Sequence, residues 1–152
     1  VFTIYLPKAP SEIPLSETRR ELPRGNEHLL IVDDEPAIAK LEHRLLEQLG
    51  YRVTAQTDSR KALALFEASP DVFDLVITDM TMPNMTGDQL AKELIAIKSN
   101  LPIIILTGFS ERINKNKAEA GGIKGFLMKP VLKNDMAAEV RRVLDASTRE
   151  LS

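Results

Sequence analysis

Short apolar runs, each bounded by chain breakers or polar residues, restrict the folds open to this chain. The run Leu75–Ile77 is rich in β-branched residues and too brief for a buried helix, so it predicts a strand buried on both faces. Four further segments are predicted to be strands: 29–32, 51–57, 103–106 and 125–128. A chain with five such segments is expected to build its core around one sheet.

Amphipathic segments separate these strands. Pro36 suits a first helical position, and Ile38, Leu41 and Leu45 follow it at helical spacing until Gly50 stops the helix. Further helices are expected at 59–66, with Asp58 or Ser59 as the cap, and at 90–97, 111–120 and 136–144. Strands that alternate with helices imply a parallel sheet with right-handed crossovers and helices on both faces. We therefore predict a doubly wound α/β fold.

Polar residues stand where four of the predicted strands end. In the strand order 2-1-3-4-5 the winding reverses between the first and third strands, and ligands bind in the crevice at such a point. Those two strands end at Asp33-Asp34 and Asp79, and the neighbouring strands end at Thr107 and Lys129. Each residue alone could cap a helix or lie solvated at a strand end. Five of them on one rim favour a functional site.

Composition excludes several classes of protein. The 152 residues are 43% hydrophobic, which fits one domain with a real core and an appendage. A net charge of −2 does not favour nucleic acid or an anionic membrane as a partner on electrostatic grounds. Without cysteine there is no disulfide framework or thiolate metal site, so a cytoplasmic protein is the default. No apolar run approaches the ~20 residues of a membrane span.

The strand ends resemble those of one family, the receiver domain of two-component response regulators. The residues that carry the resemblance are Asp33-Asp34, Asp79 followed by Met-x-Met-Pro-x-Met-x-Gly, Thr107-Gly108, and Phe126-x-x-Lys129-Pro130. They occur in order and without gaps over roughly 28–149. The resemblance implies a flavodoxin-like receiver fold with a five-stranded parallel sheet of order 2-1-3-4-5, and a cis peptide bond between Lys129 and Pro130. It also implies that Asp79 accepts a phosphoryl group from a kinase phosphohistidine.

The resemblance further implies a Mg²⁺ site around Asp79. Asp34 and Asp79 would ligate the metal directly, Asp33 would act through water, and the backbone carbonyl of Thr81 would complete the protein ligands. Such a set suits Mg²⁺, a hard cation that binds through one or two carboxylates and phosphate oxygens and keeps several waters. The Lys129 ammonium would offset charge on the phosphoryl oxygens.

A conformational switch is also implied by the resemblance. The Thr107 hydroxyl would move to the phosphoryl group, and the Phe126 ring would swing inward and remodel the face formed by the fourth helix, the fifth strand and the last helix. The fourth helix, 111–120, has few large apolar residues, as expected of an element of low local stability. Thr81 and Phe109 would flank the path of hydrolytic water, and the bulky Phe109 predicts slow loss of the phosphoryl group.

Residues 1–27 have a different character. Alternating apolar residues over 2–6, ended by Pro7, predict a half-buried strand, and 8–27 has the prolines and mixed charges of a linker. The strand is similar to the last strand of the ATP-binding domain of sensor histidine kinases. The predicted divisions are 1–7 for that strand, 8–27 for the linker and 28–149 for the receiver. We therefore interpret the chain as the C-terminal receiver of a hybrid sensor histidine kinase.

This interpretation implies particular partners for the chain, and two other interpretations of the chain stay open. The phosphodonor would be a histidine kinase domain of the same polypeptide, cytoplasmic or anchored to a membrane, and a histidine phosphotransfer protein is a further candidate partner. The fragment would catalyse only its own phosphotransfer. One alternative is a free-standing response regulator, although such a protein would normally begin only a few residues before His28. Another alternative is a docking module with the receiver fold that is never phosphorylated. A phosphatase with an Asp nucleophile would want Asp in place of Thr81, and a nucleotide-binding domain would need a Gly-rich loop after the first strand.

Overall fold

The computed structural model describes residues 24–108 and 123–151. The predicted strand over 2–6, most of the linker, Phe109 and the predicted helix over 111–120 lie outside the described residues.

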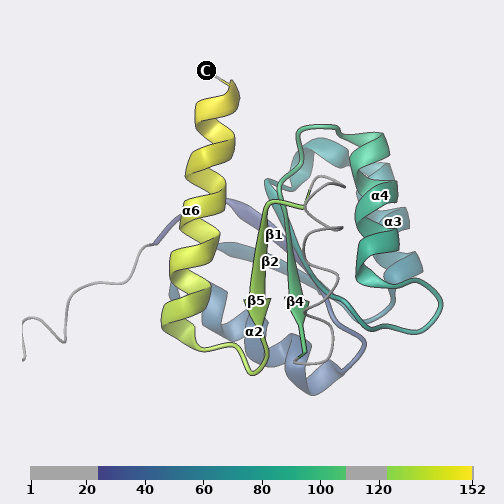
Figure 1. Cartoon of the computed structure of the whole chain (residues 1–152), viewed down its shortest axis with the longest axis horizontal. Coiled ribbons are helices and arrows are strands. Elements are labelled where there is room, and N and C mark those ends of the chain that lie inside the picture. Colours follow the sequence, from purple (N-terminus) through teal and green to yellow (C-terminus); the bar gives the residue numbers. More distant parts are fainter. Residues whose placement is uncertain (1–23, 109–122, 152) are drawn as a thin grey trace, which may run out of the picture.

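One parallel five-stranded sheet forms the centre of the molecule (Figure 1). Its strands are β1 (His28–Val32), β2 (Arg52–Gln56), β3 (Leu75–Asp79), β4 (Ile103–Thr107) and β5 (Gly125–Met128). They lie in the order β2-β1-β3-β4-β5, and every neighbouring pair is parallel. The predicted fold and strand order are therefore confirmed.

Helices cover both faces of this sheet (Figure 1). The helices are α2 (Pro36–Gln48), α3 (Ser59–Ala68), the short 3₁₀ helix η1 (Pro70–Val72), α4 (Gly87–Ile97) and α6 (Lys133–Leu151). The pair α2 and α6 lies on one face and the pair α3 and α4 on the other. The structure is doubly wound, as the alternation of strands and helices predicts.

Local sequence explains where the helices begin. Pro36 occupies the start of α2, where its missing N–H costs nothing. Asp58 is the cap of α3, because its carboxylate accepts the backbone N–H groups of Arg60 and Lys61. Before α4, the Gln89 side chain accepts the N–H of Thr86 at 3.0 Å.

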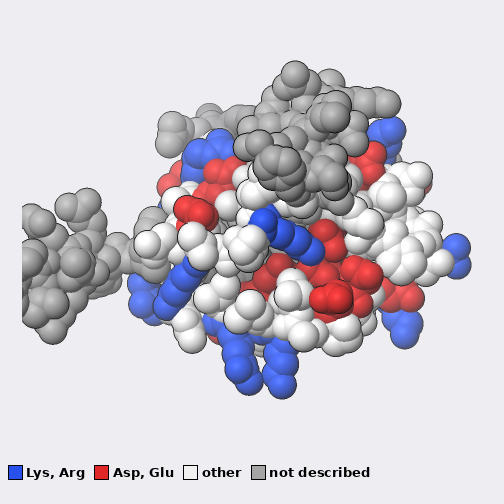
Figure 2. All heavy atoms as spheres, turned by 60° about the horizontal axis from the view of Figure 1, so that its bottom comes forward, with Lys and Arg blue, Asp and Glu red and all other residues white. Residues whose placement is uncertain are grey.

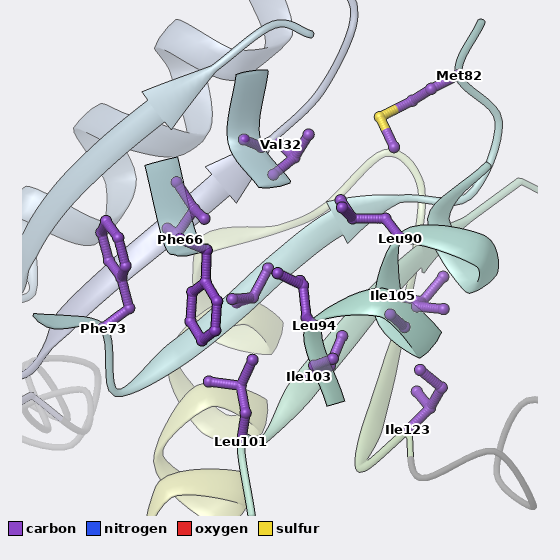
Figure 3. Packing of buried hydrophobic residues seen from close by; sticks show 14 of the residues in the cluster. Val32, Phe66, Phe73, Met82, Leu90, Leu94, Leu101, Ile103, Ile105 and Ile123 are labelled. Atoms are coloured by element: carbon purple, nitrogen blue, oxygen red, sulfur yellow. The ribbon is translucent and has the colours of Figure 1, made fainter. Parts of the chain in front are cut away.

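Two apolar layers hold the helices to the sheet. β1, β3 and β4 have buried side chains on both faces, apart from the partly exposed His28 where β1 begins. Figure 3 shows the layer under α3 and α4, where Phe66, Leu94 and Ile103 point toward one another. The rings of Phe66 and Phe73 stack with centroids 6.1 Å apart. Burial of each such side chain contributes about 1.5–3 kcal/mol, which makes these layers the main source of stability.

The inner face of α2 differs from the prediction at one turn. The sequence places Leu41 on that face, but Leu41 is 52% exposed and Glu42 is buried in its place. The buried positions Ala39, Glu42 and Leu46 follow one another three and four residues apart, which is the spacing of a single helical stripe. The prediction for Leu41 was wrong because the chain buries a carboxyl group where an apolar residue was expected.

Arg141 fastens the residues that precede β1 to α6. Its guanidinium pairs with Glu27 at 2.8 Å and with Asp145 at 2.9 Å, and it donates to the carbonyl of Arg24 at 3.1 Å. The N–H of Gly25 also bonds the carbonyl of Leu49 at 3.1 Å. Residues 24–27 are thus held at the amino end of the sheet.

The turn between β3 and α4 brings the helix unusually close to the strand end. The N–H of Gly87 donates to the carbonyl of Met80 at 2.8 Å. A Cβ at Gly87 would overlap the carbonyl oxygen of Asp79 and lie 2.9 Å from Cα of Met80. Within the turn, Asn84 has a φ of +72°, a left-handed conformation that asparagine tolerates better than most residues. Only glycine fits at position 87 without moving Asp79.

Gly87→Ala is expected to destabilise the fold by about 1–3 kcal/mol, because the added methyl group must displace backbone atoms of β3. Chemical denaturation of both proteins measures the difference. Gly108→Ala is the matched control, since no atom of the described residues lies within 4 Å of a Cβ at that position. Equal stability of the Gly87 and Gly108 variants would contradict the close approach.

Candidate functional site

Three carboxyl groups meet where β1 and β3 end. Asp33, Asp34 and Asp79 each offer a carboxylate oxygen within 4.8 Å of the other two, and we call these residues the acidic cluster. Asp33 is fully buried and Asp79 is 6% exposed, whereas Asp34 is partly open to solvent. Figure 2, which brings the lower side of Figure 1 forward, shows Asp and Glu side chains gathered near the middle of that face. The structure therefore brings together the three aspartates that the sequence singled out.

Lys129, the residue that follows β5, reaches this acidic cluster. Its Nζ lies 3.1 Å from Oδ2 of Asp79 and 3.3 Å from Oδ2 of Asp33. The peptide bond between Lys129 and Pro130 is cis, as the resemblance implies. Burial lowers the pKa of Lys129, but the hydrogen bond to Asp79 and the charge of Asp33 outweigh it and raise the pKa above its ordinary value. The ammonium group therefore keeps its charge beside the two carboxylates.

The pKa of Asp79 is raised above its ordinary value. Burial is the main cause, and the negative charge of Asp33 adds to it. The hydrogen bond and charge of Lys129, together with an N–H from Thr81, act in the opposite direction without cancelling the effect. An ionised Asp79 is thus held at a cost to the folded state.

Backbone contacts fix the orientation of Asp33. Its Oδ1 accepts the N–H of Glu35 at 3.0 Å, and its own N–H donates to the carbonyl of Gln56 at 3.1 Å. The carboxylate therefore cannot turn away from Asp79 without losing a hydrogen bond. Oxygen ligands in this arrangement fit a hard divalent cation such as Mg²⁺.

Thr107 and Phe126 lie on the strands that flank the site. Thr107 ends β4, is 7% exposed, and its carbonyl accepts the N–H of Lys129 at 2.9 Å. Phe126 is half-buried in β5 and packs against the apolar layer under α3 and α4. The register of β3 and β4 pairs Asp79 with Leu106, so the hydroxyl-bearing residue follows by one position on the same edge. The structure thus places Thr107 at the carboxyl edge next to the strand of Asp79, and Phe126 within β5 opposite Ile105.

Two further predicted residues flank Asp79 less directly. Thr81 is exposed, and its N–H supports the Asp79 carboxylate, while its predicted role as a carbonyl ligand stays a prediction. Phe109 lies outside the described residues. Sequence reasoning missed Glu42, a buried carboxyl group whose electrostatic partners are Asp33, Lys129 and Asp79. An acidic residue on the apolar stripe of a helix was the signal that could have revealed it.

The chain is similar to known receiver domains along most of its length. Residues 29–141 match the family model described as "Response regulator receiver domain". The chain is 34% identical over 142 residues to "Two-component response regulator ORR23" of Oryza sativa subsp. indica, covering 91% of this chain and 20% of that protein. It is 36% identical over 121 residues to "Two-component response regulator ARR12" of Arabidopsis thaliana, covering 77% and 20%. The chain thus spans about a fifth of the length of these curated relatives.

Solved structures give the same picture. A response regulator receiver domain protein from Clostridium thermocellum superposes with a TM-score of 0.79 at 30% identity, covering 83% of this chain and 99% of that one. The chemotaxis protein CheY4 of Vibrio cholerae superposes with a TM-score of 0.71 at 30% identity, covering 78% of this chain and 99% of that one.

No helix among the described residues is long and apolar enough to cross a membrane.

Asp79→Asn is expected to raise the free energy of unfolding at neutral pH by about 0.5–2 kcal/mol, the size common for stabilising substitutions. The pKa of Asp79 is higher in the folded protein than in the unfolded chain. Ionisation of Asp79 therefore lowers the free energy of unfolding as the pH rises from the unfolded-state pKa through the folded-state pKa. The advantage of the variant should therefore disappear below the ordinary pKa of 3.8, where the wild-type group is protonated in both states. Denaturant unfolding at pH 7 and pH 3 measures this, and an advantage that is equal at both values would contradict it.

Proposed function

Because this chain belongs to the response regulator receiver domain family of two-component systems, we propose that it is a phosphoacceptor that takes a phosphoryl group from a kinase phosphohistidine onto Asp79. The observation that carries the proposal is the meeting of the acidic cluster with the Lys129 ammonium at the carboxyl edge of the sheet. A nucleophilic carboxylate beside one fixed cation is the arrangement that phosphoryl transfer to an aspartate requires.

The residues around Asp79 have separate tasks in this reaction. A carboxylate oxygen of Asp79 forms the new bond to phosphorus while the bond from phosphorus to the imidazole nitrogen of the donor breaks. Lys129, already 3.1 Å from Asp79, offsets charge on the phosphoryl oxygens. The N–H of Glu35 holds the Asp33 carboxylate in place beside Asp79. Transfer of this kind depends on position and charge more than on acid–base chemistry.

We assign Mg²⁺ to the acidic cluster. Asp34 and Asp79 would hold it directly, Asp33 through water, and the carbonyl of Thr81 would be the remaining protein ligand. When bound, Mg²⁺ supplies positive charge that neutralises the transferred phosphoryl group. Three carboxylates within 4.8 Å of one another, with Lys129 as the one lysine paired with them among the described residues, support this assignment.

The signal would pass from Asp79 through Thr107 to Phe126. In this proposal the Thr107 hydroxyl donates to a phosphoryl oxygen, and the space that it leaves admits the Phe126 ring from its half-buried position. The surface that changes would include β5 and α6. The bulky Phe109 would slow the approach of hydrolytic water, and Thr81 would flank the same path.

For the parent protein we propose a hybrid sensor histidine kinase, with residues 1–7 from its ATP-binding domain, 8–27 as linker and 28–149 as receiver. The phosphodonor is then a kinase domain of the same polypeptide in the cytoplasm, and a histidine phosphotransfer protein is a further partner. The curated relatives carry the name of response regulators, so a response regulator is the second candidate. A chain that begins at Arg24 should still be phosphorylated, and loss of phosphorylation would place residues 1–23 within the receiver unit.

Incubation with Mg²⁺ and acetyl phosphate is expected to add one phosphoryl group per chain, detected by intact mass. Asp79→Asn should abolish the adduct, whereas Asp71→Asn, which changes an exposed carboxylate on η1, should leave it unchanged. If neither acetyl phosphate nor a cognate kinase yields an adduct, the docking module that is never phosphorylated becomes the better description.

Millimolar Mg²⁺ is expected to raise the melting temperature, because a ligand that binds only the folded state stabilises it, here by about 1–3 kcal/mol near saturation. Asp34→Asn should weaken that response, and the exposed Asp71→Asn serves as the control. Thermal melts over a Mg²⁺ series measure both variants. Melting curves that do not change with Mg²⁺ would remove the metal from the proposal.

A further inference from the structure

β5 is an edge strand of the sheet, and two side chains of the neighbouring helix α6 bind its backbone (Figure 1). Oε2 of Glu139 accepts the N–H of Phe126 at 3.1 Å, and Arg142 donates to the carbonyl of Lys124 at 3.0 Å. Arg142 also holds Glu139 itself, through two hydrogen bonds of 2.8 Å. We call Glu139 and Arg142 the edge pair. An edge strand normally presents such backbone groups to solvent or to another chain, so the edge pair takes the place of a neighbouring strand.

Close packing also joins α6 to β5. A Cβ at Gly125 would lie 2.6 Å from Oε2 of Glu139 and 3.0 Å from Cγ2 of Val143, so a larger residue there would push the Glu139 carboxylate away. Between these contacts, Val140 of α6 is fully buried in the apolar layer against the sheet. Because packed side chains leave no free space between the two elements, β5 cannot shift without moving α6.

A third residue of α6 binds the chain ahead of β1. Arg141 pairs with Glu27 at 2.8 Å and donates to the carbonyl of Arg24 at 3.1 Å, and we call these three residues the N-terminal clamp. The N–H of Gly25 belongs to the same peptide group as that carbonyl, and it donates to the carbonyl of Leu49 at 3.1 Å. The peptide group between Arg24 and Gly25 is thus held at both its oxygen and its nitrogen.

The edge pair and the N-terminal clamp use the same turn of one helix. Arg141 lies between Glu139 and Arg142 in α6, and neighbouring residues of an α-helix cannot move independently. Helix shifts in conformational switches are about 1–2 Å. A shift of that size would lengthen the 3.1 Å hydrogen bond of Arg141 beyond the ~3.5 Å at which such bonds are lost. A movement of α6 with β5 should therefore open the N-terminal clamp.

We propose that α6 transmits the phosphorylation state of Asp79 to the residues ahead of β1, because the edge pair ties α6 to β5 and the N-terminal clamp ties it to residues 24–27. When the Phe126 ring turns inward, β5 and α6 shift together and Arg141 releases the carbonyl of Arg24. Phosphorylation thus loosens the chain where it enters the domain. The inference rests on the proposed function, because the phosphoryl group and the movement of Phe126 are those proposed there.

Hydrogen exchange of the Gly25 amide in the full chain tests the proposal. With Mg²⁺ and acetyl phosphate this amide should exchange at least about fivefold faster than with Mg²⁺ alone, since couplings between two sites are typically of this size or larger. The amide of Ala62, which bonds the carbonyl of Asp58 in α3, should not change and is the internal control. An unchanged Gly25 amide, with Asp79 shown to be phosphorylated by intact mass, would overturn the inference and leave the proposed function intact. A chain that is never phosphorylated would overturn both.

Variants of α6 separate the two sets of contacts. Arg141→Met should speed exchange of the Gly25 amide without phosphorylation and leave little further response. Glu139→Ala should keep the amide protected but remove the response to phosphorylation, whereas Glu139→Gln should retain the response, because its amide oxygen can still accept the N–H of Phe126. Asp135→Asn removes an exposed carboxylate from the same helix and should behave as wild type. A full response in Glu139→Ala, or slow exchange in Arg141→Met, would overturn the proposal.

Discussion

Repulsion among carboxylates that the backbone holds together is the constraint on which this site depends. β1 and β3 are adjacent parallel strands, so Asp33 and Asp79 must emerge at the same edge. Both strands are buried on both faces, and neither can shift to separate the charges. Lys129 offsets part of the repulsion. The folded chain therefore attracts further positive charge to this site, and that charge would stabilise a phosphoryl group bound there.

The surrounding structure serves to keep that arrangement rigid. Gly87 lets α4 approach so closely that its first N–H bonds the carbonyl of Met80, which fixes the backbone directly after Asp79. On the other side, the N–H of Glu35 fixes the carboxylate of Asp33. Backbone contacts on either side thus hold Asp33 and Asp79, whereas the proposed switch residues Thr107 and Phe126 lie on β4 and β5.

Much of this structure could be predicted from sequence, because its signals are local. Strands were visible as apolar runs, and the aspartates as the residues that end them, so topology alone brought Asp33, Asp34 and Asp79 together. Glu42 was missed because an acidic residue on a helix is normally solvated, and its burial depends on how α2 packs on the sheet. The contact of Arg141 with Glu27 spans 114 positions and has no local signal.

That contact has a consequence for geometry. Arg141 holds residues 24–27 at the amino end of the sheet, and Asp79 lies at the carboxyl end, one strand length away. A strand of five residues is about 17 Å long at 3.3–3.4 Å per residue. Any polypeptide joined ahead of Arg24 is therefore attached at the opposite end of the sheet from Asp79. Under the proposed function, a donor on the same polypeptide would have to reach Asp79 by way of a linker long enough to pass around the domain.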